Sequence, residues 1–406
     1  CLITCAVLIL AAGAGHPIGF SAVALPQLRI ENSTMRIDED MGSWIASIHS
    51  AATPLGSMLS GPIMEAIGRK RTLQACTLPL IVGWIIIGTA SHHALLLLGR
   101  IVCGFAVGIM AAPSQVYLGE ISEPRLRGLL IGTPFVAYSL GVLYVYALGG
   151  ALPWRSVAHL STVLPALAFL ALCLSPESPT WLARRGRFHD AMAAMSRLRG
   201  DPDTAQRELH ELISAREKEK ARGEEKINFL ETVRRAPVLK PLLLINAFNI
   251  LQILSGSYVV IFYAVDIVKD SGGALQPTGP GSGITPPALI LSYVAFNTLG
   301  FFLLPGLMIG ELLPTKVRGL CGGYIFCLFN SVLFGFTKLY PVMKNSIGIA
   351  GVFGLFGASS LLATIVLFLL LPETKGKSLL QIEQYYQKSN ILWISRKKMA
   401  TESQRV

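Results

Sequence analysis

The sequence predicts an all-α, polytopic transmembrane helix bundle with about ten spans, and three observations support this fold class. Hydrophobic residues make up 52% of the 406 positions and charged residues only 15%, whereas an ordinary globular chain carries about 25% charge. The mean hydropathy is +0.55. The apolar residues also form runs near the length of about 20 residues that a helix needs to cross a bilayer. These properties exclude a soluble domain with one core.

Ten apolar runs reach this length, six before a long charged segment and four after it. The predicted spans are Leu2–Leu25, Met41–Met64, Thr72–Ala90, Ala94–Leu118, Gly128–Ala151, Trp154–Leu174, Pro241–Val265, Ala288–Gly310, Leu320–Val342 and Ile347–Leu371. This order predicts a six-helix bundle over residues 1–175, a helical linker over 176–240, an incomplete four-helix bundle over 241–371 and a tail over 372–406.

The net charge of +11 is better explained by the membrane surface than by nucleic acid, because the basic residues cluster beside the apolar runs. Three basic loops fall on one side of the predicted topology. The positive-inside rule makes that side cytoplasmic, and both termini and the linker lie there too. The basic loop residues are Arg69, Lys70, Arg71, Arg125, Arg127, Lys316 and Arg318.

One outer loop carries a glycosylation sequence. Asn32 begins Asn-Ser-Thr between the first two spans, where a glycan could be added. The alternative, of equal weight, is an unmodified asparagine too close to the bilayer.

Catalysis, metal binding and cofactor binding are not indicated. The seven cysteines fall singly, without a metal-binding spacing. The histidines, including His92 and His93, lack ligand spacing with cysteines or acids. We therefore expect no enzyme active site, no metal and no cofactor.

An internal repeat divides the chain into two related bundles. Glu120 is followed seven residues later by Arg127, and Glu311 is followed at the same spacing by Arg318. Each copy leads through two spans to a second signal. These signals are Pro176-Glu177-Ser178-Pro179 and Pro372-Glu373-Thr374-Lys375-Gly376.

The second bundle lacks two spans in comparison with the first. Four predicted spans precede Glu120, whereas only two separate the linker from Glu311. The Gly/Pro-rich tract Asp270–Pro287 lies within that shorter interval. Since the loss of two spans leaves the topology unchanged, we interpret this tract as an outer loop at the place of a missing helix pair.

The motifs resemble those of a known family. Gly61-x-x-x-Glu65-x-x-Gly68-Arg69-Lys70 resembles the loop motif of the major facilitator superfamily, with Glu in place of the usual Asp. Gly99-Arg100, the Glu120 motif and the two Pro-Glu motifs resemble its sugar porter branch. Gly15–Pro26 and Ser43–Ile48 look most like the insect facilitated trehalose and glucose transporters. The resemblance covers nearly the whole chain and implies a major facilitator fold with two of its twelve spans absent.

The resemblance implies a uniporter that carries a small sugar, hexose or trehalose, across the lipid bilayer, in the plasma membrane. No nucleic acid partner is expected, and the oligomeric state stays open. No carboxylate falls at the middle of a predicted span, and proton-coupled transporters need such a group. The alternative is a non-transporting or incomplete family member: a splice form or gene-model product, a sensor, or an interaction protein.

Ion pairs at cytoplasmic helix ends are expected to form and break as the two bundles alternate between states. The alternative is that these side chains are solvated anchors. The resemblance places in this cytoplasmic gating network Glu65, Arg69, Arg100, Glu120, Arg127, Glu177, Glu311, Arg318 and Glu373.

A sugar site needs amides for the hydroxyls and aromatic rings for the apolar face. Gln252 matches the first glutamine of the family's seventh-span motif, and Tyr258 stands at its asparagine position. Asn330 is a third candidate contact within a span. The equal alternative for all three, and for Asn249 and Asn297, is hydrogen bonding between helices.

Other family contacts are absent. Phe135 aligns with the family's fifth-span glutamine, Ile253 with its second seventh-span glutamine, and Gly306 with its tryptophan before the Glu311 motif. His16 also lies within a span, and we interpret it as a packed residue. Few of the family's polar sugar contacts are therefore present in this sequence.

Overall fold

The computed structural model of the chain describes residues 2–30, 35–123, 127–221, 233–270, 303–313 and 317–372, together with 292, 382 and 385–387. Within these ranges the regular structure is helical and no strand occurs. The predicted all-α polytopic bundle is confirmed.

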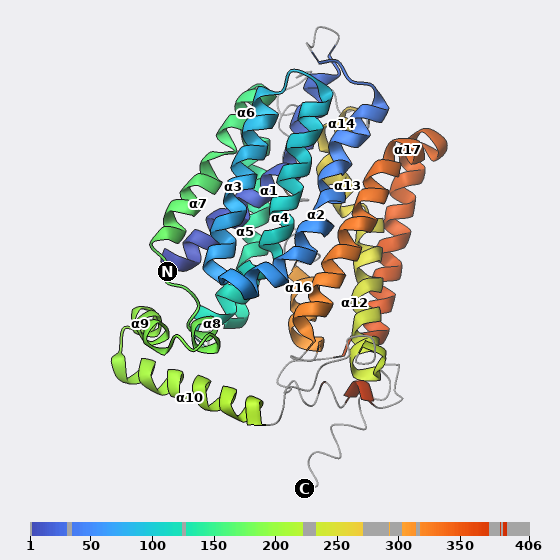
Figure 1. Cartoon of the computed structure of the whole chain (residues 1–406). Coiled ribbons are helices and arrows are strands. Elements are labelled where there is room, and N and C mark those ends of the chain that lie inside the picture. The colour runs from blue at the N-terminus through green and yellow to red at the C-terminus, as the bar shows by residue number, and fades with distance from the viewer. Residues whose placement is uncertain are drawn as a thin grey trace.

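The helices form two groups with short helices at one end (Figure 1). The first group is α1 (Leu2–Leu28), α2 (Glu39–Ile67), α3 (Arg69–Thr89), α4 (His93–Ile121), α5 (Arg127–Gly149), α6 (Trp154–Leu160) and α7 (Val163–Cys173). The short helices are α8 (Pro179–Arg184), α9 (Phe188–Arg199) and α10 (Pro202–Ala221). The second group is α12 (Ala236–Leu254), α13 (Ser257–Phe262), α14 (Ala264–Asp270), α16 (Leu303–Leu312) and α17 (Arg318–Leu370).

The end of the bundle at α8, α9 and α10 is called the linker end below, and the opposite end is called the far end. Seven described helical segments are long and apolar enough to cross a membrane, and α6 and α7 together form one of them. The helix α2 also coincides with a predicted span, and the short α16 overlaps the end of the predicted span Ala288–Gly310, most of which lies outside the described residues. The predicted seventh span is not one continuous helix, because α12 ends at Leu254 and α13 begins at Ser257.

The 53-residue α17 contains two spans. A straight helix of that length would extend about 80 Å, far more than the bilayer core of about 30 Å. Gly348, with φ 70° and ψ 169°, interrupts the helical backbone. A positive φ favours glycine, and Figure 1 shows α17 turning back at the far end. The two predicted spans, Leu320–Val342 and Ile347–Leu371, lie on either side of this turn.

The helices α2 and α4 pack at backbone contact. A Cβ added at Gly104 would collide with the His49 carbonyl oxygen, and one added at Gly108 would collide with the Thr53 carbonyl oxygen. Glycines allow this close approach between helices in a membrane. The contact fixes the backbone of α2 around His49 against α4.

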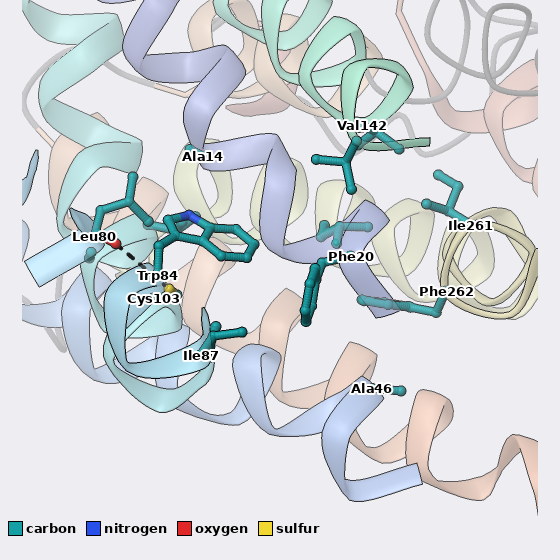
Figure 2. Close-up of a cluster of buried hydrophobic side chains, with 14 of the residues drawn as sticks. Ala14, Phe20, Ala46, Leu80, Trp84, Ile87, Cys103, Val142, Ile261 and Phe262 are labelled. Carbon is teal, nitrogen blue, oxygen red and sulfur yellow. Dashed lines mark hydrogen bonds between the residues drawn. The ribbon is translucent and has the colours of Figure 1, made fainter. Parts of the chain in front are cut away.

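The larger cluster of buried apolar side chains runs through both helix groups. Phe20 of α1 packs edge-on against Trp84 of α3, with ring centroids 5.3 Å apart. Figure 2 shows Phe20 with Trp84 on one side and Ile261 and Phe262 of α13 on the other. The same cluster includes Tyr340 of α17. The two halves are therefore joined through a common apolar core toward the far end.

A second apolar cluster lies at the linker end and contains only residues of the second half. Its buried members include Val238 and Phe248 of α12, Leu312 of α16 and Cys321 of α17. Among the described residues, the halves thus share a core at the far end but not at the linker end.

Candidate functional site

A cavity lies between the two halves, with about 1020 Å³ of space that no atom fills when the open solvent at its mouth is included. Its walls come from α1, α2, α4 and α5 of the first half and from α12, α13, α16 and α17 of the second. The polar side chains on these walls are His49, Ser50, Thr53, Ser114, Gln115 and Tyr138 from the first half, and Asn249, Gln252, Tyr258 and Asn330 from the second.

The three predicted substrate residues all line this cavity. Gln252, Tyr258 and Asn330 are each less than 10% exposed. The Tyr258 ring meets the Phe329 ring edge-on, with centroids 5.3 Å apart. Asn330 donates its amide to the Phe326 carbonyl oxygen of its own helix, at 2.9 Å. The structure therefore brings Asn330 to the same cavity as Gln252 and Tyr258, which precede it by more than 70 positions.

Several polar atoms on the cavity walls have no hydrogen-bond partner. They are both ring nitrogens of His49, Oγ of Ser50 and Oδ1 of Asn249. Buried polar groups without partners are rare in native structures. Their presence around one cavity is what a site for a polar ligand requires.

The polar wall of α2 was not among the predicted site residues. Ser43, Ser47, Ser50 and Ser57 recur at helical spacing, and such residues share a face of the helix. Only Ser50 of this stripe lines the cavity; His49 and Thr53, four residues apart, form a second polar pair beside it, and this pair was the signal in the sequence that could have identified the wall.

At the linker end, Arg69 joins two carboxylates. Its Nε lies 3.0 Å from Oε2 of Glu120, and its Nη2 lies 2.8 Å from Oε1 of Glu65. The Arg69 side chain is only 2% exposed. A buried guanidinium needs such charge-assisted bonds, so Glu120 and Glu65 hold the start of α3 against the ends of α4 and α2.

Glu177 completes this network at the start of α3. Its carboxylate accepts the backbone N–H groups of Lys70 at 2.9 Å and Arg71 at 3.3 Å. An acidic group at a helix N-terminus is stabilised by the unpaired N–H groups and the helix dipole. Ser178 donates its hydroxyl to Oε2 of Glu120. The predicted residues Glu65, Arg69, Glu120 and Glu177 therefore lie together.

The assignment of Arg100 to this network is wrong. Arg100 is fully buried toward the far end of α4, and its separation from Glu120 along the helix corresponds to about 30 Å. Its guanidinium donates to the Ile45 carbonyl oxygen at 3.0 Å and to Oγ of Ser21 at 2.7 Å. It also donates to the carbonyl oxygens of Pro17 and Ala46. Arg100 therefore ties α4 to α1 and α2.

Some predicted residues lie outside the described part of the chain. This applies to the side chains of Arg127, Glu311 and Arg318, and to the whole of Asn32 and Glu373. Asn297 and most of the Gly/Pro-rich tract, residues 271–287, lie outside it as well.

Polar contacts cross between the halves at the far end. Arg29 Nη1 of the first half lies 2.6 Å from Asp266 Oδ2 of α14. Lys338 Nζ of α17 lies 2.6 Å from Asp40 Oδ1 of α2. Asn345 Nδ2 donates to Glu39 Oε2 at 3.1 Å. These contacts lie at the end where the halves share their core.

Two helical halves around a central cavity define a transporter fold of the major facilitator superfamily. The structure is similar to the inward-open xylose transporter XylE from E. coli, with a TM-score of 0.72 at 17% identity, covering 94% of this chain and 99% of that chain. It is equally similar to the partially occluded inward-open form of XylE, with a TM-score of 0.72 at 16% identity, covering 93% of this chain and 99% of that one.

The family is shown by sequence. The family described as "Sugar (and other) transporter" matches residues 15–274 and 272–386, and the chain belongs to it. Two curated relatives are named facilitated trehalose transporter Tret1. The one from Culex quinquefasciatus is 30% identical over 91% of this chain and 82% of its own length. The one from Aedes aegypti is 30% identical over 91% of this chain and 53% of its own length. The chain thus spans about half the length of some of these relatives. They are transporters, not enzymes.

Proposed function

We propose that this chain is a facilitative transporter that moves a small sugar, hexose or trehalose, through alternating access of its two halves. Family membership and the relatives named trehalose transporters support this substrate class. The position of the cavity between the halves supports the mechanism, because transporters of this architecture bind substrate between their repeats.

The observation that carries the proposal is the chemistry of the cavity wall. Amide, hydroxyl and phenol groups from both halves line it, and none of the described lining residues is Asp, Glu, Lys or Arg. A sugar presents hydroxyls that both donate and accept hydrogen bonds, and it carries no charge. Such a wall suits a neutral polyol.

Transport without proton coupling is supported by the environment of Arg100. All of its hydrogen bonds described above end on neutral oxygens, including Oγ of Ser21. A proton-coupled transporter needs an ionisable acid within its spans. Among the described residues, the hydrogen bonds of Arg100 include no such acid.

We assign sugar contact to Gln252, Tyr258 and Asn330, which line the cavity. The Arg69 network is assigned to gating: its described ion pairs lie at the linker end within the first half, and they hold in place the surface that the second half would meet as the halves rock. In this proposal Arg127, Glu311, Arg318 and Glu373 belong to the same gate. The linker end and both termini face the cytoplasm, the protein resides in the plasma membrane, and Asn32 is open to glycosylation.

The chain is also proposed to lack one helix pair of the second half. The two segments that match the family meet at residues 272–274, inside the Gly/Pro-rich tract. The alignment with the Culex relative runs over 427 positions, more than the whole of this 406-residue chain. The first fact supports a break at the predicted place, and the second supports an omission from this chain.

Uptake of radiolabelled glucose and trehalose by proteoliposomes tests the function. We expect saturable uptake that does not depend on a pH gradient and that Gln252→Ala reduces about tenfold, as the loss of a buried hydrogen-bonding group would do. Gln74→Ala, outside the cavity, is the matched control. Folded protein that takes up neither sugar would instead support a non-transporting family member.

A further inference from the structure

His49 lies on α2 at the cavity wall, and neither of its ring nitrogens has a hydrogen-bond partner. The residue is only 2% exposed. An unsatisfied buried polar group costs about 1–3 kcal/mol. A ring placed this way therefore calls for a partner that binds in the cavity.

The backbone around His49 cannot withdraw from this position. The His49 carbonyl lies where any side chain at Gly104 would collide with it. One turn earlier, the carbonyls of Ile45 and Ala46 are held by Arg100. α2 is thus fixed to α4 on both sides of the imidazole.

The same surroundings define the chemistry of the ring. A buried imidazole beside a fixed guanidinium, with no carboxylate bonded to it, is stable as the neutral ring. A neutral imidazole offers one N–H donor and one acceptor nitrogen. That pair of functions matches a hydroxyl group, which also donates and accepts.

Two further unpartnered atoms share the cavity with His49. Oγ of Ser50 lies on the same helix, and Oδ1 of Asn249 belongs to α12 of the second half. A ligand with several hydroxyls can satisfy these groups from both halves at once. The first half otherwise presents Phe135 at the position where the sugar porters have a glutamine.

We propose that His49 is the sugar-binding residue of the first half, bonding one hydroxyl of the substrate, with Ser50 beside it and Asn249 opposite. The assignment rests on the proposed sugar transport and adds a specificity-determining residue to it. A sugar that lacks the contacted hydroxyl is discriminated against through His49.

The test measures the sugar concentration for half-maximal thermal stabilisation of the purified chain, and the KM of uptake, with glucose and a series of monodeoxyglucoses. We expect His49→Leu to raise both values for glucose about tenfold, which equals the loss of one buried hydrogen bond. The monodeoxyglucose that lacks the contacted hydroxyl is expected to bind the wild type weakly. Its half-maximal concentration and KM are expected to be the same in His49→Leu. His49→Gln, which keeps a donor and an acceptor, restores part of the affinity.

His16 provides the matched control. It is also a fully buried histidine of the first half, but it stacks on Tyr144 and lies outside the cavity lining. His16→Leu is expected to leave the half-maximal concentrations unchanged for every sugar. If His49→Leu does not fold, Ser50→Ala and His49→Gln are measured against the same series.

Two results separate the assignment from the function on which it rests. If sugars neither stabilise the wild-type protein nor are taken up by it, the proposed function is refuted, and the assignment of His49 with it. The assignment of His49 alone is refuted if wild-type uptake is normal but the His49 variants do not discriminate among the analogues. In that case their half-maximal concentrations and KM values rise by one common factor for all analogues, or do not change.

Discussion

Lys338 of α17 places its Nζ 2.6 Å from Oδ1 of Asp40 on α2 and 4.3 Å from the centre of the Trp44 ring. The same amine lies 2.7 Å from Oγ of Ser43. One lysine of the second half therefore contacts three residues within the first two turns of α2. Together with the Arg29–Asp266 pair, it closes the far end of the cavity.

In the Lys338→Met variant, we expect a larger share of the molecules to have an open far end. The pair is partly exposed, with side-chain exposures of 24% for Lys338 and 75% for Asp40, so its loss weakens the closed state by about 1 kcal/mol. That energy shifts the populations about fivefold. Spin labels at Ile30 and Ile347, both exposed at the far end, report the change as a larger long-distance population.

The charge-swapped double variant Asp40→Lys with Lys338→Asp serves as the control and returns the distribution toward that of the wild type. An unchanged distance distribution in Lys338→Met would show that this contact does not hold the far end closed.

Arg69→Met should destabilise the protein much more than Glu65→Gln. The arginine is 2% exposed and bonds to Glu120, which is 15% exposed, so its removal leaves a largely buried carboxylate without its partner. The expected loss is about 3 kcal/mol. Glu65 is 54% exposed, and its neutralisation costs about 0.5 kcal/mol. Thermal unfolding in detergent measures both, and equal losses would contradict the buried character of the network.

Gly68→Ala is expected to lower stability by about 2 kcal/mol or more. Gly68 has φ +103°, and a Cβ there would lie 2.5 Å from Oε2 of Glu177. The substitution therefore strains the backbone and displaces the carboxylate that caps α3. Gly61→Ala is the matched control, since nothing lies within 4 Å of its added Cβ. Similar melting temperatures for the two variants would argue against this contact.

Phe135 and Gly306, two departures from the sugar porter pattern, lie against each other at the cavity wall. A Cβ added at Gly306 would lie 2.6 Å from Cε2 of Phe135. Gly306→Trp alone should therefore lower stability and uptake, because the phenylalanine ring occupies the space. The double variant with Phe135→Gln should fold better and bind glucose several-fold more tightly than the wild type, since it gains an amide and an aromatic surface.

Thermal stability and glucose affinity of the two single variants and the double variant give the coupling between the sites. Additive effects would mean that Phe135 does not limit what position 306 can hold.

The fold was predictable because the span length is set by the bilayer and the repeat is visible in the residues themselves. The prediction of one network that contains Arg69 and Glu120 followed from both lying at helix ends on one side. Arg100 was misplaced because its place in the network rested on the family resemblance alone. Its actual acceptors are backbone carbonyls of α1 and α2, which a sequence does not reveal.

The cavity was only partly predictable. Gln252 matched a family motif and lies on the wall as expected. His49 was missed because its position depends on the rotation of α2, and the close contact at Gly104 sets that rotation. A single histidine in an apolar helix does not indicate which neighbour it faces.

The apolar core shared by the two halves toward the far end also has a kinetic consequence. Opening the far end separates residues such as Phe20 and Phe262, and exposing apolar surface costs free energy in proportion to its area. An empty carrier has no sugar contacts to offset that cost, so its return to the outward-facing state should limit the cycle. Unlabelled sugar inside a vesicle should then accelerate the entry of labelled sugar, and exchange should outpace net flux.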